Sequence, residues 1–264
     1  YHELRMVMQT VSLCDVITVE EGGTGFTLLT GEAFSLPADK VSMEQRAAEA
    51  FFAALGVPVP PLTVRLEKNI PAFAGLGGGS ADVAALLRCL RRLYAAGMPD
   101  EALRAIGLTV GSDVPFCVSG GTSLAEGRGE RLTDLPPLPV CQIVLCKPDF
   151  GISTPELFVL ADGAVLSKRP DIASLTAALQ GGELTGVTDR LCNVFEEFLP
   201  ERYREVFRIK EILLAHGALN AAMSGSGPTV YGIFESAAEA QRAAEVMKKS
   251  YQQTYVAKPV KKLV

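Results

Sequence analysis

The chain has 264 residues, of which 48% are hydrophobic, and a net charge of −5. This length allows a sizeable core in one or two domains, and the apolar content excludes a disordered or fibrous chain. The apolar runs are broken by charges and glycines well short of the ~20 residues that span a bilayer. The acidic balance also disfavours a nucleic-acid-binding surface. Composition therefore predicts a globular protein without membrane or nucleic-acid partners.

The cysteines and histidines limit the chemistry further. Six cysteines form no CxxC pair and lie mostly in apolar runs, which predicts buried, reduced thiols and a cytoplasmic location. Two histidines, His2 and His216, are too few for a histidine-based metal cluster. The sequence starts at Tyr1 rather than at Met and shows no signal-peptide pattern, so we expect an upstream segment to be missing from it.

The first half of the chain is predicted to mix strands and helices. Alternating apolar residues favour strands over 5–11, 16–20, 25–29 and 62–66. Apolar residues at helical spacing predict helices over 42–55, which Ser42 can cap, and over 83–94. We expect a short helix over 101–106 that stops at Gly107, and short strands over 116–118 and 121–125.

A proline-rich stretch over 135–139 is the one clear break in composition, and we place a domain boundary there, giving domains 1–137 and 138–264. The second domain is predicted to contain strands over 140–146, 218–223, 229–234 and 254–257. Its predicted helices cover 154–160, 172–179, 191–198, 203–216 and 237–248. Because strands and helices do not strictly alternate, the expected fold class is α+β rather than a doubly wound sheet.

A glycine-rich stretch over 71–82, between a predicted strand and a predicted helix, is the strongest functional signal. It places free backbone N–H groups at a helix N-terminus, where the helix dipole favours phosphate. The alternative is a flexible loop in which Ser80 or Asp82 only caps the helix. No Lys follows the glycines, and a Ser does, so the stretch is neither a Walker loop nor a dinucleotide fingerprint.

Two further stretches carry candidate chemistry. Asp113 lies in an apolar setting, where an idle carboxylate is costly. It is either a turn or N-cap aspartate, or a general base that accepts the proton of an attacking hydroxyl. The segment over 224–227, Ser-Gly-Ser-Gly, is either a plain hairpin loop or a second backbone cradle that closes over phosphate.

The order of strand, Gly-Leu-Gly-Gly-Gly-Ser and helix resembles the ATP loop of the GHMP small-molecule kinases. Stretches over 1–2, 110–116, 125–130, 151–158 and 223–227 are similar, in chain order, to one branch of that family. This branch uses ATP and Mg²⁺ to phosphorylate the 2-hydroxyl of a cytidine-diphosphate-linked methylerythritol in isoprenoid precursor biosynthesis. The resemblance implies a two-domain fold, with an N-terminal domain like domain 2 of ribosomal protein S5 and a ferredoxin-like C-terminal domain.

The resemblance also implies roles for single residues. Asp113 is the expected catalytic base. The expected ATP-binding residues are Lys68 near the adenine, Gly75, Leu76, Gly77, Gly78, Gly79 and Ser80 around the phosphates, and Ser224, Gly225 and Gly227 at the phosphate end. Ser80 is also expected near the metal. The expected substrate-binding residues are Tyr1 and Phe158, which would sandwich the cytosine, His2 at the base edge, and Thr154.

Two features depart from the family pattern. The family carries a catalytic Lys on a strand upstream of the Tyr-His pair, and this sequence starts after that point; Ser42 stands where the family commonly has Asn. Other readings stay open: a GHMP kinase of the mevalonate or homoserine type, or a nucleotide-binding fragment without catalysis. An S5-like RNA-binding module is disfavoured by the acidic balance.

Overall fold

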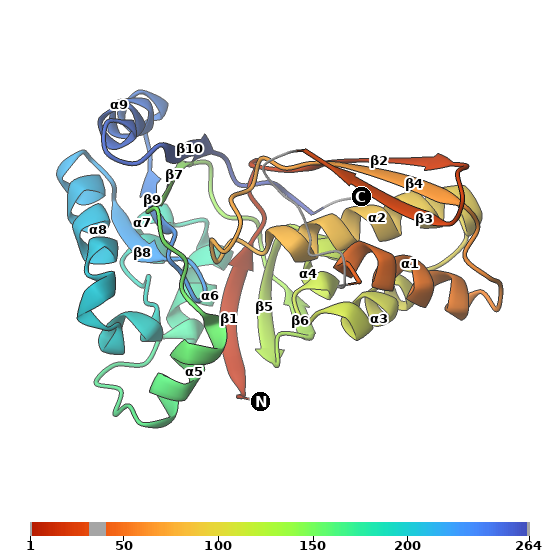
Figure 1. The fold of residues 1–264 in the computed structure, drawn as a ribbon. Helices are drawn as coiled ribbons and strands as arrows, with labels where there is room; N and C mark the ends of the chain where they lie inside the picture. Colours follow the sequence, from red (N-terminus) through yellow and green to blue (C-terminus); the bar gives the residue numbers. More distant parts are fainter. Residues whose placement is uncertain (1, 32–40, 263–264) are drawn as a thin grey trace.

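The computed structural model describes residues 2–31 and 41–262. The expected stacking residue Tyr1 lies outside the described residues. The strands of the described part form three sheets, and Figure 1 shows two of them on the N-terminal side of the molecule and the third among the C-terminal helices. None of the described helices is both long and apolar enough to cross a bilayer.

The first two sheets come from the N-terminal half. β1 (Leu4–Gln9) pairs antiparallel with β5 (Thr122–Gly127), which pairs with β6 (Arg131–Asp134). In the second sheet, β4 (Leu62–Glu67) lies between β2 (Val16–Glu21), to which it is antiparallel, and β3 (Phe26–Thr30), to which it is parallel. The parallel pair is joined through a crossover that contains α1, as parallel neighbours require.

Four helices pack together with the second sheet and form the N-terminal core (Figure 1). They are α1 (Met43–Ala54), α2 (Gly78–Tyr94), α3 (Asp100–Val110) and α4 (Val114–Ser119). Phe51, Leu86 and Leu87 are fully buried there. The expected cap of α1 is confirmed, because the Ser42 hydroxyl accepts a hydrogen bond from the Gln45 amide at 3.0 Å.

The C-terminal half is built on one antiparallel sheet in the order β10-β7-β9-β8. Its strands are β7 (Gln142–Lys147), β8 (Asn220–Met223), β9 (Val230–Phe234) and β10 (Gln253–Ala257). The helices α8 (Glu205–Ala215) and α9 (Ala237–Lys248) pack with it around Val144, Ile209 and Phe234. Helices connect β7 to β8, and α9 connects β9 to β10. Together with the strand order, this is the ferredoxin-like arrangement that the resemblance implies.

Shorter helices lie between β7 and α8. They are α5 (Thr154–Asp162), α6 (Ile172–Gly181), α7 (Leu184–Thr188), and the 3₁₀ turns Val194–Phe198 and Glu201–Tyr203. α7 was not expected from the sequence. The segment over 191–198, expected to be helical throughout, is helical only over its last five residues, as a 3₁₀ turn.

The two halves share a hydrophobic interface. Ile143, Leu145 and Ile233 of the C-terminal sheet pack with Leu13 and Leu76 from the N-terminal half. The end of the chain also returns to that half, since Val11 bridges to Pro259 and Gly120 to Lys262. The C-terminal sheet holds only strands that follow the proline-rich stretch, while the exact boundary at 137/138 stays a prediction.

Two expectations near Asp113 were wrong. The segment over 116–118 is helical, part of α4, because Pro115 occupies the first turn, where a missing N–H costs nothing. α3 does not stop at Gly107 but continues to Val110. Gly107 allows helices to pack closely instead, because a Cβ there would lie 2.5 Å from Cγ1 of Val114.

The six cysteines are all free thiols. Cys141 and Cys146 are buried, as expected, and their pKa values are raised by burial. The expectation of burial was wrong for Cys14 and Cys192, which are exposed.

Candidate active site

The glycine stretch forms a turn that leads directly into α2. Gly77 is the N-cap, in the left-handed conformation at φ 66°, and α2 begins at Gly78. The alternative in which Ser80 or Asp82 caps the helix is wrong, since both lie inside α2. The N–H groups of the first helical turn have no partners within a helix. Together with the helix dipole they make this turn suitable for phosphate.

Gly75 joins this turn to the loop between β8 and β9. Its φ is 71°, and a Cβ placed on it would lie 2.3 Å from the carbonyl oxygen of Ser224 and 2.8 Å from the amide nitrogen of Gly227. The Ser224 hydroxyl donates to the Gly75 carbonyl at 2.8 Å, and the Thr229 amide donates to the Ala74 carbonyl at 3.2 Å. Only glycine allows two backbones to lie this close.

The loop over 224–227 is a hairpin connection and also one wall of the site. β8 and β9 pair up to Met223 and Val230, so the loop joins adjacent antiparallel strands. Asn193, which the sequence analysis missed, donates from its side-chain amide to the carbonyls of Met223 and Gly225, each at 2.8 Å. The only sequence signal for these two hydrogen bonds was a polar residue directly before the helical stretch Val194–Phe198.

Thr154 and Ser226 link this loop to α5. Their hydroxyl groups lie 2.7 Å apart and hydrogen-bond, while Thr154 remains exposed. Three segments therefore converge: the glycine turn, the hairpin loop and the start of α5. The structure thus brings Gly75, Ser224, Gly225, Gly227 and Thr154 together.

Leu76 contributes mainly by packing. Its side chain belongs to the interface between the two halves, against the C-terminal sheet. This anchors the glycine turn to both halves of the protein. Any contact of Leu76 with phosphate would come from its backbone.

Asp113 occupies the N-cap position of α4, but its side chain makes no capping hydrogen bond. Its Oδ1 lies 3.6 Å from the position that a Cβ on Gly129 would take, so the carboxylate faces the turn between β5 and β6. Within residues 2–31 and 41–262, no hydrogen bond or ion pair to this carboxylate is formed. Burial raises the pKa of Asp113, which matches a carboxylate kept available for a proton.

The Asp113 segment is adjacent to the start of α2. A Cβ on Gly111 would lie 3.8 Å from the Ser80 hydroxyl oxygen and 3.5 Å from Cε of Met43. Gly111 precedes Asp113 by two residues, so the candidate base and the glycine turn border the same region. Figure 1 shows β5, α4 and the start of α2 near one another in the middle of the molecule.

His2 and Phe158 are stacked on each other. Their ring centroids are 4.6 Å apart with an interplanar angle of 20°. Nε2 of His2 lies 2.7 Å from a carboxylate oxygen of Asp162, and Phe195 contacts Phe158 edge to face at 5.3 Å. Phe158 lies one helical turn after Thr154, so the two share a face of α5. His2, Phe158 and Phe195 therefore form an aromatic cluster beside Thr154.

Lys68 is paired with two carboxylates behind the glycine turn. Its Nζ lies 2.7 Å from Oδ2 of Asp82 in α2 and also pairs with Asp15, which lies between β1 and β2. Asp15 additionally accepts a hydrogen bond from the Ile70 amide at 2.8 Å. The side chains of Asp15 and Asp82 are 3% and 4% exposed, so this is a buried triad. The expected position of Lys68 near the adenine of ATP stays a prediction.

The two carboxylates of the triad titrate differently. Burial raises the pKa of Asp82 to about 7, although Lys68 opposes this shift. Burial also pushes the pKa of Asp15 upward, but hydrogen bonds from Lys68 and from the amides of Ile70 and Asn69 outweigh it and leave the pKa lowered. The same partners keep the pKa of Lys68 raised, against its own burial.

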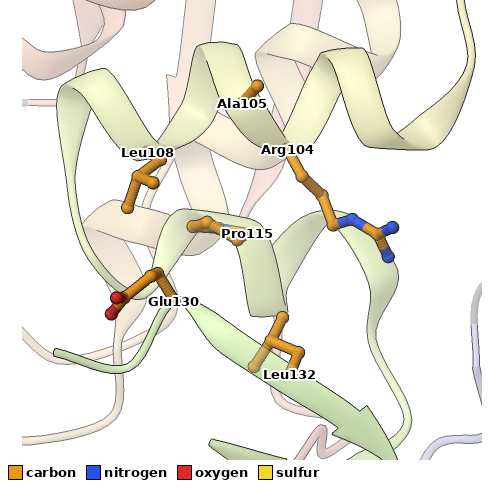
Figure 2. Close-up of a pocket in the computed structure, with 6 residues that line it drawn as sticks. All are labelled: Arg104, Ala105, Leu108, Pro115, Glu130 and Leu132. Atoms are coloured by element: carbon orange, nitrogen blue, oxygen red, sulfur yellow. The ribbon is translucent and has the colours of Figure 1, made fainter. Parts of the chain in front are cut away.

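A separate hollow lies over α3, α4 and β6 (Figure 2). It is lined by Arg104, Ala105, Leu108, Pro115, Glu130 and Leu132. The Arg104 guanidinium and the Glu130 carboxylate point away from each other at its two sides, and Arg104 donates to the Ser119 hydroxyl. Ligand sites usually have polar groups that converge. The site therefore belongs at the glycine turn.

Comparison with known proteins shows the family of this chain. The family model for the GHMP kinase N-terminal domain matches residues 42–121, and the model for the GHMP kinase C-terminal domain matches residues 171–253. The chain belongs to the GHMP kinase family. Its members are ATP-dependent phosphotransferases, and the two-domain fold expected from the motifs is confirmed.

Individual relatives point to one branch of the GHMP kinases. A 4-diphosphocytidyl-2-C-methyl-D-erythritol kinase of Caldicellulosiruptor saccharolyticus is 37% identical over 94% of this chain and 85% of the relative. A solved 4-(cytidine 5'-diphospho)-2C-methyl-D-erythritol kinase is 30% identical, covers 98% of this chain and 91% of its own, and has a TM-score of 0.81. A homoserine kinase from Cytophaga hutchinsonii, 20% identical with a TM-score of 0.76 over 97% of this chain and 89% of its own, shares the fold.

The closeness of the two loops in this GHMP kinase can be tested at Gly75. Gly75→Ala should destabilise the protein by more than the ~1–2 kcal/mol of a left-handed alanine, because the Cβ would also overlap the Ser224 carbonyl. It should weaken ATP binding roughly tenfold or more. Gly56→Ala is the matched control, since Gly56 has the same φ of 71° with nothing within 4 Å. Equal losses in urea unfolding for the two variants would contradict the loop contact.

The buried triad predicts a pH-dependent stability. The folded-state pKa of Asp82 is about 7, whereas that of an unfolded Asp is ~3.9. Ionisation of Asp82 therefore opposes folding. This destabilisation grows between about pH 4 and pH 7 and is complete above about pH 7. Asp82→Asn should therefore gain stability relative to the wild type on going from pH 4.5 to pH 8, measured by urea unfolding.

Asp15→Asn is the matched control. The pKa of Asp15 is lowered in the folded protein, so its carboxylate stabilises the fold above the unfolded pKa, and this contribution is lost only as the pH falls through the folded value. The cost of Asp15→Asn should therefore be similar at pH 4.5 and pH 8. A pH-independent difference for Asp82→Asn would refute the assigned pKa.

Proposed function

We propose that this chain transfers the γ-phosphoryl group of ATP to the 2-hydroxyl of 4-diphosphocytidyl-2-C-methyl-D-erythritol, a step of non-mevalonate isoprenoid precursor synthesis. The observation that carries this proposal is the convergence of the Gly75 turn, the Ser224 loop and the start of α5 beside Asp113, whose carboxylate has no partner among the described residues. The relatives that carry this activity in their names match nearly the whole chain.

The phosphates of ATP would lie at the N-terminus of α2. There the amides of Gly77 to Ser80 can donate to phosphate oxygens, and the helix dipole favours their negative charge. The hairpin loop at Ser224, Gly225 and Gly227 supports the glycine turn from the other half of the protein. This positioning is the main requirement of phosphoryl transfer, which needs little covalent participation by the protein.

Asp113 would accept the proton of the attacking hydroxyl. Its carboxylate faces the turn at Gly129 and has no partner among the described residues that would hold it ionised. Its raised pKa brings it closer to the operating pH, where a general base is most effective. The oxygen of the acceptor then attacks the γ-phosphorus, and the bond to the β-phosphate oxygen breaks.

The residues at the start of α2 fit a magnesium ion held largely by phosphate. In the described part of the chain, no group of three or more His, Cys, Asp or Glu side chains could hold a metal. Mg²⁺ commonly binds through one or two protein oxygens plus substrate phosphates, and the Ser80 hydroxyl beside Gly111 offers such an oxygen. Bound there, the ion would neutralise charge on the transferred phosphoryl group.

The cytosine end of the acceptor would lie on α5. The Phe158 ring accepts a flat group, since the His2 imidazole stacks on it, and the cytosine would stack in that position. Thr154, on the same face, is exposed and near Ser226. Small-molecule acceptors of other GHMP kinases lack a base, so this surface favours the cytidyl compound over mevalonate or homoserine.

A coupled ATP-consumption assay of the full-length protein tests the function. The cytidyl-linked acceptor, mevalonate and homoserine are offered side by side with Mg²⁺-ATP. We expect turnover with the cytidyl compound and none above background with the other two. Turnover with mevalonate or homoserine instead would assign the chain to another branch, and no turnover with any of the three would refute the proposal.

Asp113→Asn should separate catalysis from stability. Loss of the base should lower kcat roughly a hundredfold or more, with ATP binding little changed. Because the folded-state pKa of Asp113 is raised, ionisation of this residue opposes folding above the unfolded pKa. The variant should therefore unfold at a higher temperature than the wild type at pH 8, with the difference vanishing below pH 4. Unchanged turnover would remove Asp113 from the mechanism.

A further inference from the structure

Phe73, in the glycine turn, has an unusual backbone and an unusual exposure. It is the non-glycine residue with a positive φ, 52°, in the described part of the chain. Its side chain is 84% exposed, whereas Phe207, the next most exposed phenylalanine of the described residues, reaches 37%. A bulky residue at positive φ costs on the order of 1–2 kcal/mol. Neither the backbone nor the exposed ring stabilises the free protein.

The position of Phe73 relates it to the acceptor side of the site. A Cβ on Gly151 would lie 3.2 Å from Cβ of Phe73, so Phe73 borders the segment that leads from β7 into α5. Three residues after Gly151 comes Thr154, and Phe158 follows on the same face of α5. On its other side, Phe73 is two residues from Gly75, where the two loops meet. Phe73 therefore lies where the glycine turn joins the acceptor side.

Strained residues persist where the surrounding structure holds them, and they concentrate at ligand sites. The carbonyls of Ala74 and Gly75 accept hydrogen bonds from the Thr229 amide and the Ser224 hydroxyl, which hold the turn from one side, and Gly151 limits it from the other. The turn thus presents the ring to solvent at the edge of the site. An exposed aromatic ring held in this way is suited to packing on a ligand.

We propose that the Phe73 ring packs on the cytidine-diphosphate-linked acceptor and covers it during the reaction. The proposal rests on the function proposed above and adds a substrate-contacting residue. Covering the acceptor would remove the exposed ring from water and exclude water from the transferred phosphoryl group. The nucleotide, seated at the N-terminus of α2, would not contact the ring.

The absence of tryptophan from the chain allows a direct binding test. Phe73→Trp, made in this 264-residue chain, introduces a single indole at this position. We expect a blue shift of its emission on addition of the cytidyl-linked acceptor and no shift on addition of Mg²⁺-ATP alone. Val165→Trp is the matched control, because Val165 is 96% exposed and lies outside the converging loops; its emission should not respond.

Kinetics of Phe73→Gly provide the second test. Glycine accepts a positive φ without strain, so the melting temperature should equal or exceed that of the wild type. The KM for the acceptor should rise about fivefold or more, as expected for loss of a stacking contact, while the KM for ATP stays within about twofold. A purely structural role would instead lower the melting temperature and change both constants together.

The outcomes separate this inference from the proposed function. An indole that responds to neither ligand, or to ATP alone, overturns the inference even if the wild type phosphorylates the acceptor. An unchanged acceptor KM in Phe73→Gly does the same. Failure of the wild type to phosphorylate the acceptor overturns the proposed function, and with it the inference that rests on it.

Discussion

The structure depends on one contact between two backbones. At Gly75 the turn of the N-terminal half meets the β8–β9 loop of the C-terminal half so closely that no side chain would fit. The hydrogen bonds from the Ser224 hydroxyl and the Thr229 amide fix the register of the two loops. The phosphate site proposed here would therefore require both halves, and the shared core around Leu76 stabilises their arrangement.

Residues outside the site keep the two loops in position. Asp15, Lys68 and Asp82 connect the β1–β2 segment, the end of β4 and the first turns of α2. Because these groups are buried, loss of Lys68 would leave two carboxylates without their cationic partner. Asn193 keeps the hairpin loop in position by donating two hydrogen bonds to the carbonyls of Met223 and Gly225. The geometry of the two loops therefore depends on polar groups that lie beside the glycine turn and the hairpin loop.

The elements around the site could be predicted from the sequence because they follow from local chemistry. Periodic apolar residues identified α2, β8 and β9, and the glycines before Ser80 identified the turn. The segment over 116–118 was expected to be a strand because so short an apolar run carries no clear period, and tertiary packing made it part of α4. Gly107 was mistaken for a stop because its role, close packing against Val114, depends on a residue in another helix.

The site residues, too, could be predicted only where local sequence determines them. Asp113 and the two glycine loops could be proposed from motifs, but their neighbourhood could not, because it depends on contacts between residues about 150 positions apart, such as Gly75 and Ser224. The pairing of Lys68 with Asp15 and Asp82 was not foreseen, since each member lies in a different element. Phe73 gave no signal in composition or period; its backbone conformation singled it out.

Amide hydrogen exchange with and without Mg²⁺ and a non-hydrolysable ATP analogue tests most directly whether the two loops form one phosphate seat. The account predicts that the amides of residues 74–80 and of residues 224–227 become protected together when the nucleotide binds. Protection of the glycine turn alone, or of neither segment, would contradict it.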